Sequence, residues 1–83
     1  MKTKIKVDKQ EALRRWLDAV DGLVERSQAE RGFQADIARG LTKRGMKTFP
    51  QQVSLWLHPS EHKRWMPRAE RALAILAVVE EMT

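Results

Sequence analysis

The chain has 83 residues and a formal net charge of +5. This predicts one small basic domain over residues 1–83, which buries about two-thirds of its unfolded surface. The absence of cysteine excludes disulfides and thiolate metal sites, and no apolar run approaches a signal peptide or the roughly 18 residues of a membrane span. We therefore expect a soluble, cytoplasmic protein without a membrane partner.

The first seven residues, MKTKIKV, alternate lysine with Thr3, Ile5 and Val7. A period of two is typical of a short strand, whereas the terminal position also suits a basic arm. The pattern leaves both interpretations open.

A first helix is predicted to begin after Asp8, whose carboxylate suits the N-cap, with Glu11 placed to close a capping box. Gly32 is a natural stop after the helix. Apolar residues recur at steps of three and four and predict one buried stripe, made of Leu13, Trp16, Leu17, Val20, Leu23 and Val24.

A second helix is predicted in the segment FQADIARGLTKRG, which Gly45 ends. Its inward side is predicted to consist of Phe33, Ile37, Ala38 and Leu41.

A third helix is predicted in TFPQQVSLWL, residues 48–57, with Thr48 as N-cap and Pro50 in the first turn. The apolar residues span about 80° of arc on a helical wheel and are predicted to point inward: Phe49, Val53, Trp56 and Leu57. The outward side is predicted to carry Gln51, Ser54, Leu55 and His58, with Gln52 at its flank.

The last helix is predicted to open at Pro67 and run to Met82. It has an inward stripe of Ala69, Leu73, Leu76 and Ala77 and a second apolar stripe of Ala72, Ile75, Val79 and Met82. A small core cannot cover both, so the second stripe predicts a dimerisation surface. Trp65, in the preceding loop, either covers the core or extends that surface.

Charge is unevenly placed along the chain. Residues 7–36 hold seven acids and five bases, whereas residues 37–69 hold seven bases and one acid. This asymmetry predicts a one-sided positive field that attracts polyanions such as nucleic acid.

The glutamines of the third helix suit base recognition, because a side-chain amide presents a donor beside an acceptor, as the major-groove edge of adenine requires. Leu55 would contact a thymine methyl. The alternative interpretation is that Gln51 and Gln52 are ordinary solvated residues at a helix start.

The sequence resembles helix-turn-helix proteins of the lambda repressor and Cro type. The matching residues are QADIA (34–38), Leu41, VSLWL (53–57) and PRAERALAI (67–75). The chain departs from the family in the segment between Leu41 and Val53, which is longer here. Either an extra turn of the second helix or an enlarged link between the two helices accounts for the additional residues. It also has Phe33 where members often have Ser or Thr.

The resemblance implies that Gln34 contacts the DNA backbone and that the outward side of the third helix enters the major groove. The expected base-reading residues are Gln51, Gln52, Ser54, Leu55 and His58. The expected backbone contacts are Gln34, Lys43, Arg44, Lys47, Thr48, Lys63 and Arg64.

Other chemistry is poorly supported. His58 and His62 lie four apart, but Pro59 interrupts any helix between them and no third metal ligand follows. The serines and glycines form neither a catalytic motif nor a phosphate-binding loop. We expect no enzyme activity, no cofactor, no metal and no small-molecule ligand.

The sequence therefore predicts an all-α fold of four to five helices with a central helix-turn-helix. The expected function is sequence-specific binding of double-stranded DNA by a homodimer on a palindromic operator, with repression by occluding a promoter. The resemblance also implies that the protein acts in the cytoplasm of a prokaryotic or phage-infected cell. The alternative is a small helical interaction module, adaptor-like or antitoxin-like, that binds an acidic protein through residues 67–82.

Overall fold

The computed structural model describes residues 8–82, so the prediction of an arm or strand at residues 1–7 lies outside the described part. The helices are α1 (Lys9–Ala29), α2 (Phe33–Lys43), α3 (Pro50–Trp56) and α4 (Ala69–Met82), and a 3₁₀ turn, η1, spans Glu61–Lys63. Residues 8–82 contain no strand, which confirms the all-α prediction.

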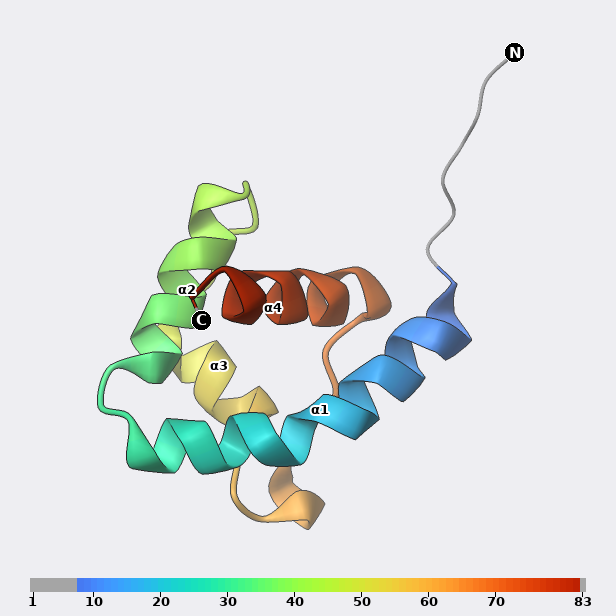
Figure 1. Cartoon of the computed structure of the whole chain (residues 1–83), viewed down its shortest axis with the longest axis horizontal. Coiled ribbons are helices and arrows are strands. Elements are labelled where there is room, and N and C mark those ends of the chain that lie inside the picture. The colour runs from blue at the N-terminus through green and yellow to red at the C-terminus, as the bar shows by residue number, and fades with distance from the viewer. Residues whose placement is uncertain (1–7, 83) are drawn as a thin grey trace.

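The four α-helices enclose one core. Figure 1 shows α1 along one side of the molecule, α4 crossing above it, α2 at one end and α3 between α4 and α1 in this view. Helix α4 packs on α1 and α2, and α3 packs on α2. The largest side chains that this arrangement buries completely are Trp16, Phe33, Ile37, Leu41, Val53, Leu57 and Ile75. Helix α2 is therefore the central element, in contact with each of the other three.

Helix α1 begins as predicted, because Asp8 Oδ1 accepts hydrogen bonds from the amides of Gln10 and Glu11 at 3.0 and 3.2 Å. Its predicted stripe is wrong at two positions, since Leu13 is 42% and Leu17 52% exposed, while Ala12 is buried. The physical reason is the rotation of the helix: its buried stripe runs through Ala12, Trp16 and Val20, and Leu13 and Leu17 each lie one residue, about 100°, around from that stripe.

The link between α2 and α3 is an enlarged turn, and α2 gains no extra helical turn. Gly45 adopts φ 88°, a left-handed conformation that favours glycine. Its amide donates to Thr42 O at 3.0 Å, and the Met46 amide donates to Leu41 O at 2.9 Å. These two bonds form the Schellman arrangement that ends a helix.

The predicted N-cap of α3 is wrong by one residue. Phe49 occupies that position in extended conformation, and Gln52 Oε1 accepts the Phe49 amide at 2.9 Å. Thr48 is buried in the link, where its hydroxyl donates to Met46 O at 2.7 Å. The Thr48 amide donates to Thr42 Oγ1 at 3.2 Å, which fastens the start of α3 to the end of α2.

Helix α4 presents the opposite stripe from the one predicted. Ala72 and Ile75 are buried with Val78, so the prediction that they form a dimerisation surface is wrong. Val79 and Met82 are partly buried against the core. The stripe predicted to face inward is only half-buried: Ala69, Leu73, Leu76 and Ala77. The reason is that α4 lies across both α1 and α2, and the 72–75–78 face meets them.

Candidate nucleic-acid interface

The two sides of α3 differ sharply. Val53, Trp56 and Leu57 are buried, which seats the helix against the core. Gln51 and Ser54 are exposed on the other side, as predicted. The prediction that Phe49 points inward is wrong, because this residue is 54% exposed. Its backbone is extended and lies before the first turn of α3, so the helical periodicity does not apply to it.

The polar side of α3 is narrower than predicted. The Gln52 side chain is half-buried and its oxygen caps α3, so this amide is not free to pair with a base. Leu55 is half-buried. His58 is half-buried too, and its Nδ1 accepts the Ser60 amide at 2.9 Å, which shapes the loop after α3. The freely presented side chains are therefore Phe49, Gln51 and Ser54.

The first turns of α2 and α3 are neighbours. Gln34 and Pro50 line one shallow hollow, together with Gly32 and the end of α1. Gln34 is half-buried there. The structure thus brings the predicted backbone contact of α2 close to the start of the predicted base-reading helix.

Two lysines predicted to contact the DNA backbone are exposed near α3. The Lys47 ammonium lies 5.6 Å from the centre of the Phe49 ring, within the range of a cation–π contact. Lys63 is exposed on η1. Both positive charges are therefore accessible to an anionic partner.

Arg64 has a structural role that excludes the predicted one. Its side chain is only 12% exposed, its Nε donates to His58 O at 3.0 Å, and Nη1 lies 3.5 Å from Asp21 Oδ1. It therefore braces the loop after α3 against α1. Its partner Asp21 is distant in sequence, so the basic run KRW gives no indication of this position.

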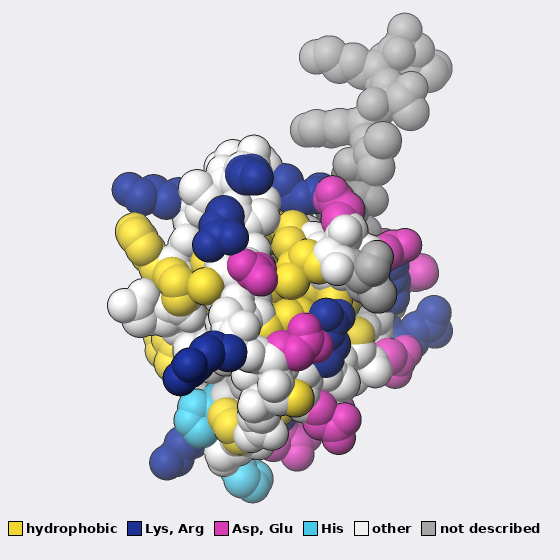
Figure 2. Space-filling model, turned by 60° about the vertical axis from the view of Figure 1, so that its left-hand side comes forward, with side chains coloured by type: hydrophobic (Ala, Val, Ile, Leu, Met, Phe, Trp, Pro, Cys, Tyr) yellow, Lys and Arg dark blue, Asp and Glu magenta, His cyan; other side chains and the backbone are white. Residues whose placement is uncertain are grey.

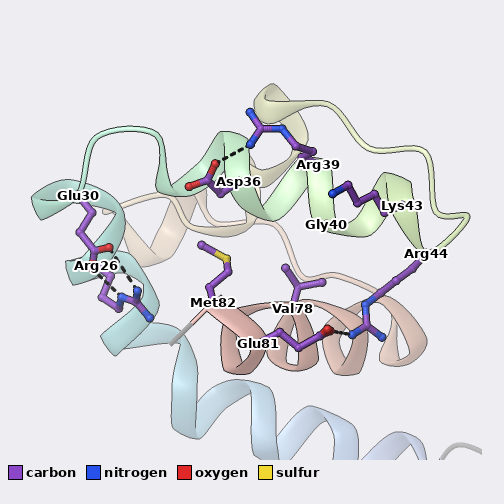
Figure 3. Close-up of a pocket in the computed structure, with 10 residues that line it drawn as sticks. All are labelled: Arg26, Glu30, Asp36, Arg39, Gly40, Lys43, Arg44, Val78, Glu81 and Met82. Atoms are coloured by element: carbon purple, nitrogen blue, oxygen red, sulfur yellow. Dashed lines mark hydrogen bonds and ion pairs between the residues drawn. The ribbon is translucent and has the colours of Figure 1, made fainter.

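Lys43 and Arg44 face a different groove. Figure 3 shows them in a groove of about 600 Å³ between the end of α1, helix α2 and the end of α4. Arg44 is ion-paired with Glu81, and no α3 residue lines this groove. At its other end, hydrogen bonds from Arg26 lower the pKa of the Glu30 carboxyl. Neither Lys43 nor Arg44 is thus placed beside Gln51.

Arg71 is a positioning residue that the sequence analysis missed. From α4 its guanidinium lies 5.4 Å from the centre of the Trp56 ring, and Nη1 is 3.5 Å from Thr48 Oγ1. It therefore touches both the link and α3. No sequence pattern indicates this role, because it depends on how α4 lies relative to α3 and the link in the folded chain.

The distribution of charge agrees with an anion-binding side. In Figure 2, Lys, Arg and His side chains lie along the left edge of the molecule, and most Asp and Glu side chains lie toward the right. Residues 8–82 contain no cluster of three His, Asp or Glu side chains that could hold a metal ion. No helix in this part of the chain is long and apolar enough to cross a membrane.

Comparisons with protein-family models, with curated proteins and with solved structures found no match to this chain.

Proposed function

We propose that this protein is a sequence-specific transcriptional regulator of the lambda repressor and Cro type, which inserts α3 into the major groove of double-stranded DNA as a homodimer. One observation carries the proposal: Gln51 and Ser54 are exposed on α3, while Val53, Trp56 and Leu57 fix its other side in the core. A rigid backing is what a base-reading helix needs, because a mobile helix would have to be ordered on binding.

The neighbouring groups fit the same geometry. Gln34 lines the same hollow as Pro50 at the start of α3, which supports a contact between its amide and a phosphate, while the exposed Lys47 and Lys63 would supply affinity by displacing counterions. The amide of Gln51 supplies discrimination, since it can pair with both groups of an adenine edge. Occupation of a promoter by this small domain would repress transcription without a sensor domain.

The alternative function, binding of an acidic protein through residues 67–82, has less support. Ala72, Ile75 and Val78 are part of the core, so this segment offers a smaller apolar surface than its sequence predicts.

Selection of bound fragments from random duplex DNA tests the proposal. We expect enrichment of one two-fold symmetric sequence and binding that weakens steeply with salt, with a slope near 0.9 per phosphate neutralised. An interaction module would show no preference among duplexes at any ionic strength, and that result would overturn the proposal.

A further inference from the structure

An apolar patch spans α1 and the loop before α4. It is made of Leu13, Leu17, Trp65 and Met66, each at least 42% exposed. Leu13 and Met66 line one hollow of about 180 Å³ with Trp16 and Pro67, so the α1 part and the loop part form one surface. An apolar patch with polar edges is typical of a protein–protein contact.

The charges along α1 extend this patch in a particular order. Lys9, Leu13, Leu17 and Asp21 follow one another at steps of four, which places them in one ridge of the helix. All four are exposed, and the Asp21 side chain is 88% exposed although Arg64 lies 3.5 Å away. The ridge is therefore positive at its start, apolar in its middle and negative at its end.

This order is complementary to itself in one orientation only. When two copies of the ridge cross antiparallel, Lys9 of one meets Asp21 of the other, twice, and the leucines meet at the centre. A parallel crossing would place like charges together, which opposes association. We infer that this ridge, flanked by Trp65 and Met66, is the surface through which two copies of the chain associate about a two-fold axis.

A second copy fits the patch better than an acidic partner. An acidic surface would satisfy Lys9 but repel Asp21, whereas the same ridge reversed satisfies both charges. The patch is also tied to α3, because the Trp65 amide donates to Leu55 O at 2.9 Å. A two-fold axis here would therefore fix the separation of two α3 helices, as a symmetric operator requires.

This inference rests on the proposed function for the role of the dimer, but the experiment that tests it contains no DNA. Sedimentation equilibrium of the whole chain should show a reversible monomer–dimer equilibrium. Leu17→Glu should abolish dimers, and Lys9→Glu alone should weaken the dimer by about tenfold, since it replaces two attractive pairs with repulsive ones. Asp21→Lys alone should have the same effect, and its urea unfolding is measured as well, because Asp21 also pairs with Arg64 within the chain. The reversed double variant, Lys9→Glu with Asp21→Lys, should associate again with nearly the wild-type affinity.

Matched controls distinguish an effect of the ridge on dimerisation from an effect of net charge. Asp18→Lys and Arg15→Glu make the same charge changes at exposed positions of α1 off the ridge and should leave the dimer unchanged. Circular dichroism checks that each variant is folded. A wild-type chain that stays monomeric, single reversals without effect, or a double variant that stays weak would each overturn the inference. Loss of DNA binding by dimeric protein would instead count against the proposed function alone.

Discussion

A Cβ atom at position 40 would lie 2.5 Å from Cγ1 of Val78, so α2 and α4 meet where α2 has no side chain. Valine in a helix has essentially one rotamer and cannot turn away. Gly40→Ala should therefore lower the free energy of unfolding by about 1–3 kcal/mol, despite the better helix propensity of alanine. Urea denaturation measures this.

The control for that substitution is Gly22→Ala in α1, because no atom lies within 4 Å of a Cβ built there. It should stabilise the protein by up to about 1 kcal/mol. Combining Gly40→Ala with Val78→Ala should recover part of the loss. Equal effects of alanine at positions 22 and 40 would show that the two helices do not meet as described.

The hydroxyl of Thr42 joins the end of α2 to the link before α3. It donates to Ala38 O at 2.9 Å and accepts the Thr48 amide at 3.2 Å. Thr42→Val keeps the shape and removes both bonds, so we expect a loss of about 1 kcal/mol, whereas Thr42→Ser should be close to wild type. If thermal unfolding shows Val and Ser to be equivalent, the hydroxyl does not hold the link.

Gln51 and Ser54 should determine base preference. Gln51→Ala or Ser54→Ala should reduce the preference for the selected site over random duplex by about 1–3 kcal/mol, with unchanged unfolding. Competition binding measures the ratio. Gln52→Ala should instead lower stability, because its oxygen caps α3. Equal losses on cognate and random DNA would contradict base reading by Gln51.

Phe49 should add an apolar contact with a thymine methyl, since this residue is exposed two positions before Gln51. Replacing thymines of the selected site by deoxyuridine one at a time should reveal a position where wild type loses about 0.8 kcal/mol, the value of one buried methyl group. Phe49→Ala should be insensitive at that position. The backbone bond to Gln52 survives this substitution, so the cap stays in place. Equal sensitivity of both proteins at every thymine would reject the contact.

Lys47 should contribute to binding of every duplex alike. Lys47→Ala should reduce the salt slope by about 0.9 and leave the selected sequence unchanged. Lys43→Ala is the comparison, because Lys43 lines the groove that contains no α3 residue and should change the slope less. A changed consensus in the Lys47 variant would show that this side chain contacts bases.

Spacing alone predicted the helices and most of the core. The inward faces of α2 and α3 were correct at Ile37, Leu41 and Val53, because periodicity reports which side of a helix is apolar. The failures have a common origin in tertiary structure. Leu13 and Leu17 continue the apolar period of α1, yet the other helices cover the neighbouring stripe of Ala12, Trp16 and Val20 instead.

The candidate site was predicted only in part for the same reason. Thr48 is a good N-cap by residue type, but Thr42, six residues earlier, holds its amide and leaves the cap to Phe49. The positive charges of Arg44 and Arg64 could be counted in the sequence, whereas their partners Glu81 and Asp21 lie far along the chain. Pairing of this kind cannot be inferred from local spacing.

Arg71 has a consequence for local unfolding. Helix α3 has seven residues, too few to persist alone in water, and one side chain from α4 touches both its buried ring, Trp56, and the link that leads into it. Helix α3 packs on α2, so its amides should exchange with solvent deuterium when α3 detaches from α2, and loss of the Arg71 contacts should make that local opening more frequent without unfolding α4.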